Sequence, residues 1–233
     1  MAWNGNSESN QAVYKNYMYT NKVFLLDEIT PTNCAFLIGD LTQFIGDPEN
    51  EKKRLNLFIN SPGGDANTMM TILGLLNLAR LNDIYITTYV LGLAGSAASI
   101  IAAQGDSRFI SDISRHFVHF GSIFDTTSKP SEIEKTYQQN KDYAEKMQDL
   151  YIKSCKGKMP RELLLSLQSD ERGYLNARQC LKYGLCDVII EDELANKRKQ
   201  ESKNEELEKE FETFIKDKKQ SEVKKKTIKK KGK

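Results

Sequence analysis

The chain has 233 residues, 39% of them hydrophobic, which is enough for one sizeable core with an appendage. The formal net charge is +2, but residues 191–233 carry 15 Lys and Arg against 11 Asp and Glu, which leaves 19 against 21 for residues 1–190. The mildly acidic charge of residues 1–190 argues against a nucleic-acid-binding domain. No apolar run reaches the roughly 18 residues of a membrane span, and residues 1–20 lack a signal-peptide pattern. We therefore expect a cytoplasmic protein that binds neither nucleic acid nor membrane.

In the first half of the chain, strand and helix patterns alternate after a polar, aromatic arm at residues 1–20, which we expect to be flexible. Alternating or β-branched apolar residues predict strands, and apolar residues at helical spacing predict helices. Thr30 followed by Pro31 is typical of a helix start. The predicted elements are strands at 22–26, 54–60 and 84–91, helices at 30–45 and 66–81, and a helix of small residues at 92–103.

The second half continues this alternation up to residue 190 and then changes character. The predicted elements are strands at 108–110, 116–119 and 186–190, a long charged amphipathic helix at 131–155, and helices at 160–168 and 176–183. This alternation with short connections predicts an α/β fold with a mostly parallel sheet. Beyond residue 191 Glu and Lys dominate; part of residues 193–216 has the spacing of a solvated helix, and we expect the lysine-rich end to be disordered.

Four cysteines, Cys34, Cys155, Cys180 and Cys186, occur without CxxC spacing and without a nearby histidine. This pattern favours neither a zinc site nor a disulfide framework. We therefore expect reduced, mostly buried thiols and no metal.

Two glycine-rich turns follow consecutive predicted strands. Gly63 and Gly64 precede a helix, where they could expose backbone N–H groups as an oxyanion hole does, or form a plain strand-to-helix turn. Ser96 stands where a strand hands over to the small-residue helix, so its hydroxyl could be a nucleophile near the helix dipole or an ordinary N-cap.

Histidine discriminates between these alternatives, because a serine nucleophile needs a base that titrates near neutral pH. The chain has only His116 and His119, three residues apart in one predicted strand. Their side chains should point to opposite faces, so at most one can readily face Ser96.

The two turns and the histidines belong to a larger set of ordered segments: residues 58–64 (FINSPGG), 92–96 (GLAGS), 115–119 (RHFVH), 157–160 (GKMP) and 174–187 (YLNA…YGLCD). Over roughly residues 14–190 they resemble the INSPGG, GxAAS, RVMIH, TGKP and FMSA…YGLVD segments of the proteolytic subunit of the caseinolytic (Clp) protease family. The resemblance implies the ClpP/crotonase fold, with repeated β-β-α units and a protruding handle helix at 131–155. It also implies a peptidase domain at 21–192, between the arm at 1–20 and a charged tail at 193–233.

Carried over by position, the resemblance implies Ser96 as nucleophile and His119 as general base. It implies the backbone N–H groups of Gly64 and Ala97 as the oxyanion hole. His116 falls where the family has an apolar strand residue, so we interpret it as structural.

The third position of the triad departs from the family. The family has an Asp two residues before the aromatic residue that aligns with Tyr174, and this chain has Arg172 there. An arginine carries only donors and cannot accept the imidazole N–H. Either Asp170, which we favour, or Glu171 replaces it through a local shift at Gly173, or the Ser–His dyad works alone and Asp170 is a plain surface acid.

A second departure lies at residues 120–122 (FGS), where the family has Gln-Pro at the border of the substrate cleft. We therefore expect a different substrate preference and ring packing. The polar and apolar stripes of the helix at 131–155 suit interdigitation between two rings.

The resemblance implies a serine endopeptidase subunit of an ATP-dependent Clp-type protease that cleaves unfolded polypeptides inside two stacked heptameric rings, a homo-oligomeric tetradecamer. No cofactor is implied in this chain; without a Walker motif, ATP would be used by a partner AAA+ unfoldase. Two alternatives stay open: a catalytically weak or silent structural ring subunit, which Arg172 favours, and a phage-type processing protease, and with them a plastid stroma or a phage-infected cell as location. An acyl-CoA enzyme of the crotonase fold is disfavoured, because Ser96 and His119 both fall on protease positions.

Overall fold

The computed structural model describes residues 23–47, 54–119, 133–169, 173–206 and 209. The chain divides into two compact units, Met1–Ile190 and Glu191–Lys233, and this division falls close to the expected boundary after residue 192. The expected arm at 1–20 lies outside the described residues.

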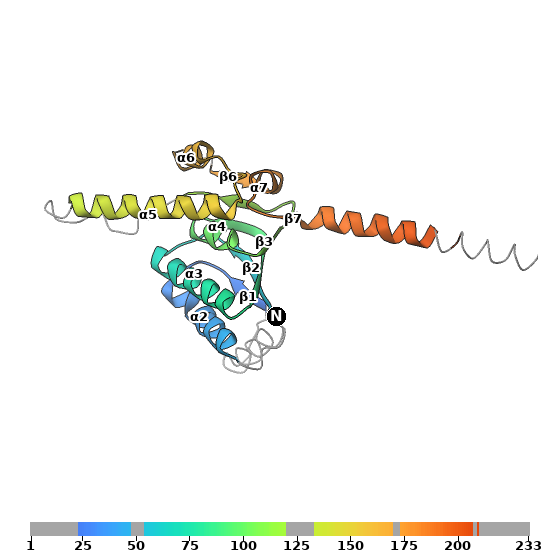
Figure 1. Ribbon diagram of the computed structural model, residues 1–233, viewed down its shortest axis with the longest axis horizontal. Helices are drawn as coiled ribbons and strands as arrows, with labels where there is room; N and C mark the ends of the chain where they lie inside the picture. Colours follow the sequence, from blue (N-terminus) through green and yellow to red (C-terminus); the bar gives the residue numbers. More distant parts are fainter. Residues whose placement is uncertain (1–22, 48–53, 120–132, 170–172, 207–208, 210–233) are drawn as a thin grey trace, which may run out of the picture. The chain divides into compact units, whose positions relative to one another are not determined.

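The first unit alternates strands and helices (Figure 1). Its strands are β1 (Val23–Leu26), β2 (Arg54–Ser61), β3 (Tyr85–Gly95), β4 (Ser107–Ile110), β5 (Arg115–Phe117), β6 (Tyr174–Asn176) and β7 (Val188–Ile189). Its helices are α2 (Pro31–Gly46), α3 (Ala66–Leu81), α4 (Ala97–Ala102), α5 (Ile133–Ser154), α6 (Arg161–Ser169) and α7 (Ala177–Tyr183). The expected α/β class is confirmed, and most predicted elements appear within a few residues of their expected ends.

The sheet is mostly parallel, as predicted. Strands β1, β2, β3, β4 and β7 follow one another in that spatial order, and every pair among them is parallel. Strand β5 lies parallel to the last part of β3, and β6, which the sequence did not predict, pairs antiparallel with β5. Because β3 pairs with three strands, its carboxyl end lies at the centre of the arrangement.

Local sequence signals set several helix ends. Thr30 accepts a hydrogen bond from the Asn33 N–H at 3.0 Å, which caps α2 as predicted. Asn176 and Gln179 form a reciprocal capping box at the start of α7. Gly184, with φ of 77°, ends α7 in the left-handed conformation that favours glycine.

Helices α2, α3 and α4 lie on the same side of the sheet (Figure 1). In β2 the side chains of Leu55, Leu57 and Ile59 are buried at alternate positions, as a strand with one covered face requires. The core therefore lies between these helices and the sheet.

The other positions of the central strands carry a ladder of aromatic rings. Phe58 of β2 stacks on Tyr89 of β3 at 4.7 Å between ring centroids, and Tyr89 stacks on Phe109 of β4 at 5.1 Å. The three rings are half-buried, so the described residues cover this face of the sheet only in part.

Helix α5 is the expected handle. Residues 133–146 contain no buried side chain, whereas Met147 and Tyr151 near its carboxyl end are buried. Its first turns project beyond α3 and α4 (Figure 1), which confirms the protruding helix. Residues 131–132 of the prediction lie outside the described residues.

The predicted helix at 92–103 is wrong in its first part. Strand β3 continues to Gly95, and α4 is only six residues long. The Asn60 side chain fills a bulge between β2 and β3, where its Oδ1 accepts the Leu93 N–H at 3.1 Å and lies against Gly92. Pairing with β5 then holds residues 93–95 in a strand, although Leu93 and Ala94 have high helix propensity.

Several remaining expectations can be compared with the described residues. All four cysteines are buried and unpaired, as expected. No described helix is long and apolar enough to cross a membrane. In the second unit, residues 191–206 are helical and largely exposed, which confirms that part of the predicted solvated helix, while residues 210–233 lie outside the described residues.

Candidate active site

The two glycine-rich turns touch each other, because β2 and β3 are parallel neighbours whose carboxyl ends share one edge. A Cβ atom built on Gly95 would lie 2.5 Å from the Pro62 carbonyl oxygen. A Cβ atom on Gly63 would lie 2.5 Å from the Gly95 carbonyl oxygen and 2.8 Å from the Ser96 Cβ. Only glycine permits this backbone approach.

Ser96 lies in a strained turn between β3 and α4. Its φ of 49° and ψ of −120° are unusual for a residue with a side chain, and such strain is common at active sites. The half-buried side chain makes no capping hydrogen bond, so the N-cap alternative is wrong. A serine held on a sharp strand-to-helix turn is the arrangement that presents the nucleophile in α/β-hydrolases.

Strand β5 brings His119 to the same edge. Gly95 pairs with Phe117, and the Ser96 N–H donates to the Phe117 carbonyl at 2.7 Å. His119 follows two residues later; its ring is half-buried and lies 5.3 Å from the Phe117 ring, between centroids. The nucleophile candidate and the base candidate are therefore on adjacent strand ends.

The two predicted oxyanion donors, Gly64 and Ala97, belong to the two turns that meet at Ser96. The Ile29 N–H donates to the Gly63 carbonyl at 2.8 Å and the Asp65 N–H to the Ile29 carbonyl at 2.7 Å, so Gly64 turns its own N–H away from Ile29. The Ala97 nitrogen, at the start of α4, lies 3.1 Å from the position of a Cβ on Gly63. Among the described residues, neither the Gly64 N–H nor the Ala97 N–H donates to a backbone carbonyl in a turn or loop.

The third triad candidates, Asp170 and Glu171, lie outside the described residues, and so do Arg172 and residues 120–122. The next described residue, Gly173, accepts the Val118 N–H at 2.8 Å. The described chain thus resumes beside the residue that precedes His119.

His116 is completely buried, in agreement with the structural role expected for it. Its Nδ1 lies 2.8 Å from the Ser99 hydroxyl oxygen, and its Nε2 has no hydrogen-bond partner among the described residues. Burial, and secondarily the positive charge of Arg108, lower the pKa of His116 to about 3. His116 is therefore neutral near pH 7, and its hydrogen bond to Ser99 is a feature that sequence reasoning missed.

The sequence held one signal for this contact. Ser99 follows Ser96 by three residues and His116 precedes His119 by three, so the two elements that carry the candidate site could meet a second time. As for metals, the described residues contain no group of three His, Cys, Asp or Glu side chains that could hold an ion.

Comparison with known proteins points to one family. A family model described as Clp protease matches residues 5–193. The chain is 29% identical over 153 residues to the ATP-dependent Clp protease proteolytic subunit 4, chloroplastic, of Arabidopsis thaliana, an alignment of 62% of this chain and 48% of that protein. It is 24% identical over 196 residues to the ATP-dependent Clp protease proteolytic subunit 1 of Rhodopirellula baltica, an alignment of 78% of this chain and 82% of that protein.

The chain thus spans about half the length of the first relative and most of the second. The family match runs from the residues before β1 to the end of the first unit, and includes both glycine-rich turns and β5. On this evidence the chain belongs to the Clp protease family.

Proposed function

We propose that this chain is a serine endopeptidase in which Ser96 is the nucleophile and His119 the general base. The observation that carries the proposal is the strained turn at Ser96, whose N–H is bonded to β5 two residues before His119. A serine hydroxyl becomes a nucleophile when an adjacent imidazole can accept its proton.

The chemistry follows from the positions of these groups. His119 takes the Ser96 proton as the hydroxyl attacks the peptide carbonyl. The N–H groups of Gly64 and Ala97 stabilise the resulting oxyanion. His119 then protonates the leaving amine, and water hydrolyses the acyl-enzyme by the same steps.

The third group of the site is part of the proposal. We assign the orientation of His119 to Asp170, because Arg172 cannot accept the imidazole N–H. Asp170→Asn should then lower kcat by up to the order of 10⁴, which is the cost of losing this carboxylate in a related triad. Glu171→Gln and Arg172→Asp serve as comparisons; if Arg172→Asp raises peptidase activity strongly while Asp170→Asn has no effect, the assignment to Asp170 is wrong.

A fluorophosphonate probe tests the nucleophile, because it acylates activated serines. We expect the full-length protein to be labelled at Ser96, identified by mass spectrometry of the labelled peptide. Ser96→Ala and His119→Ala should abolish labelling, whereas Ser166→Ala, on the exposed side of α6, should leave it unchanged.

Arg172 favours a second candidate function, a catalytically silent subunit that occupies ring positions beside an active relative. A native oligomer that stays unlabelled at Ser96 would favour this candidate over the endopeptidase.

We further propose that the chain forms double heptameric rings around an internal chamber, and that a partner AAA+ unfoldase uses ATP to deliver unfolded polypeptides. Membership of the Clp protease family and the projecting helix α5, which would interdigitate between rings, support this assembly. Counting subunits per ring by negative-stain microscopy tests it.

A further inference from the structure

A second serine–histidine contact lies behind the candidate site, and it uses the same two elements. Ser99 is in α4, three residues after Ser96, and His116 is in β5, three residues before His119. Both side chains have 0% exposure. A buried pair cannot reach a polypeptide substrate, so its role must be sought in what it holds together.

The contact gives α4 and β5 a second point of attachment. The first is the main-chain hydrogen bond from the Ser96 N–H to the Phe117 carbonyl. The second is the Ser99–His116 hydrogen bond, one helical turn away, and the Ser99 N–H in turn donates to the Ser96 carbonyl at 3.0 Å. With the first hydrogen bond alone, α4 could rotate about that bond relative to β5. The second hydrogen bond fixes the orientation of the first turn of α4 on β5.

This rotation sets the direction of the Ser96 hydroxyl relative to His119. The backbone of Ser96 is strained, and strain of this kind persists only when the surroundings over-determine the conformation. A hydrogen bond inside the core is well suited to that, because water does not compete for it.

The handle helix reaches the same point. Tyr151 of α5 is completely buried, and its phenol interacts with the Ser99 side chain, which offsets part of the rise in the Tyr151 pKa that burial causes. Gln104, just after α4, donates to the Ser154 hydroxyl of α5 at 2.7 Å. The carboxyl end of α5 is therefore joined to α4 at Ser99 and again beyond the end of α4.

We propose that Ser99 and His116 are positioning residues for the Ser96–His119 reaction, which hold the first turn of α4 on β5, and that Tyr151 links the handle helix to them. The inference rests on the proposed endopeptidase function. It gives His116 a task beyond filling the core, through the hydrogen bond that an apolar residue at this position could not make.

The test must separate positioning from stability. Ser99→Ala alone leaves His116 buried without a partner and should destabilise the fold, which by itself could lower activity. The triple variant Ser99→Ala/His116→Leu/Tyr151→Phe replaces all three polar groups by apolar ones, a change that can be nearly neutral for stability. Thr88→Val is the control, since it removes a buried hydrogen bond of 2.8 Å between β3 and Ala102 at the other end of α4.

Three quantities are measured on the full chain in its native oligomer: the melting temperature, the rate of fluorophosphonate acylation of Ser96, and kcat and KM for a fluorogenic peptide. We expect the triple variant to melt above Ser99→Ala but to show at least a tenfold lower acylation rate and kcat, with KM within twofold of wild type. Thr88→Val should acylate within twofold of wild type although it melts lower.

A triple variant that acylates Ser96 at the wild-type rate overturns the positioning role and leaves the endopeptidase proposal intact. A wild-type protein that is never labelled at Ser96 overturns the endopeptidase proposal itself, and the inference with it.

Discussion

Ser96 occupies a backbone conformation in which glycine would be unstrained. Its φ of 49° brings Cβ into conflict with neighbouring backbone atoms in any residue other than glycine. We therefore expect Ser96→Gly to be more stable than Ser96→Ala by about 1 kcal/mol, although both lack the hydroxyl. Urea unfolding of the two variants measures the difference, and an equal or greater stability of Ser96→Ala would show that the turn is not strained.

The buried imidazole of His116 makes stability depend on pH. Burial and the charge of Arg108 lower its pKa from 6.5 to about 3, so in mild acid the unfolded chain binds a proton at this residue and the folded chain does not. The free energy of unfolding therefore has its full value, as far as His116 is concerned, when the pH is well above 6.5. It decreases as the pH falls from 6.5 towards 3. Between pH 7.5 and pH 5 the expected loss is about 2 kcal/mol, with a slope that approaches about 1.4 kcal/mol per pH unit below pH 6.

The variant His116→Leu isolates this contribution, because the carboxylates of the protein titrate equally in both proteins. Chemical unfolding of wild type and variant at several pH values should give a shallower decline for the variant. Parallel curves would mean that the imidazole is not kept neutral by the fold.

Because the two glycine-rich turns are in contact, we expect replacement of a glycine by alanine to have very different effects inside and outside these turns. Gly95→Ala would place a Cβ 2.5 Å from the Pro62 carbonyl oxygen, which is backbone and cannot rotate away. We expect the turns to separate, with loss of Ser96 labelling and a stability loss of about 1–3 kcal/mol. Gly74→Ala is the matched control, since nothing lies within 4 Å of its Cβ position in α3 and alanine there should stabilise by up to about 1 kcal/mol. Unimpaired labelling of Gly95→Ala would contradict the close approach.

The sequence predicted those elements that local signals define. Helix α2 begins after Thr30, and helix α7 begins after Asn176 and ends at Gly184, as these residues indicate. In β2, buried and more exposed side chains alternate as the sequence predicts. Strand β6 escaped prediction because its three residues extend only through pairing with β5. The last part of β3 was mistaken for a helix because Leu93 and Ala94 have high helix propensity, while the bulge at Asn60 and the partner strand decide otherwise.

In the candidate site, too, local sequence signals indicate some residues, whereas others depend on tertiary packing. Motifs with their order indicated Ser96 and His119, and the structure brings these residues to the ends of adjacent strands, while their catalytic roles stay predictions. The Ser99–His116 contact depends on how α4 packs on β5, which no local pattern encodes. The question of Asp170 stays a prediction.

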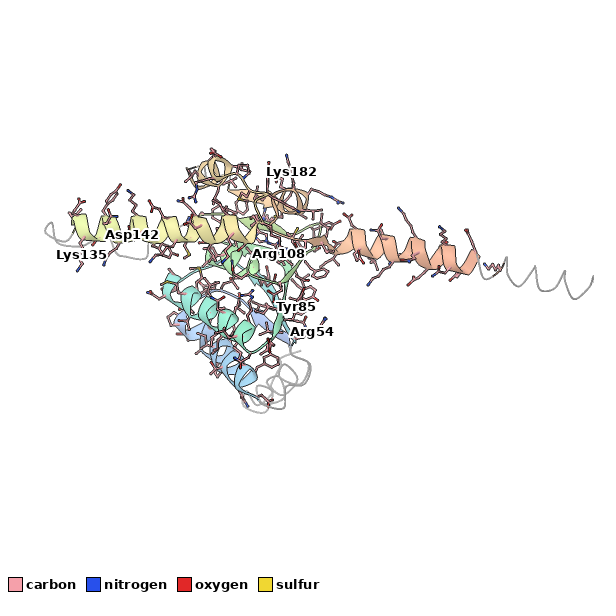
Figure 2. All side chains as sticks on the ribbon, viewed as in Figure 1. Arg54, Tyr85, Arg108, Lys135, Asp142 and Lys182 are labelled. Atoms are coloured by element: carbon pink, nitrogen blue, oxygen red, sulfur yellow. The ribbon has the colours of Figure 1, made fainter. Side chains whose placement is uncertain are left out.

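Arg108 joins distant parts of the first unit. Its side chain, labelled in Figure 2, is 3% exposed and binds both carboxylate oxygens of Asp187 at 2.7 and 2.9 Å. The same guanidinium donates to the carbonyls of Ser154 and Gly184, each at 2.7 Å. Burial raises the pKa of the Asp187 carboxyl, but the hydrogen bonds and charge of Arg108 outweigh this and leave the pKa lowered.

Removing this guanidinium should therefore cost far more than removing a surface charge. Arg108→Leu removes the two guanidinium hydrogen bonds to Asp187 and those to the two carbonyls, and we expect a loss of about 3–5 kcal/mol in the free energy of unfolding. Lys156→Met is the comparison, because Lys156 also pairs with Asp187, at 3.4 Å, but is 64% exposed, so its loss should cost less than about 1 kcal/mol. Similar losses for the two variants in denaturant titrations would refute the role assigned to Arg108.

The burial of the His116 imidazole has a practical consequence for chemical modification of this protein. Diethyl pyrocarbonate modifies histidines that it can reach, and of the two histidines in the chain only His119 has exposed surface while the fold is intact. Carbethoxylation of histidine in the native protein would thus stop at one imidazole per subunit, and protection of that imidazole by a bound peptide would report occupancy of the candidate site without any engineered label.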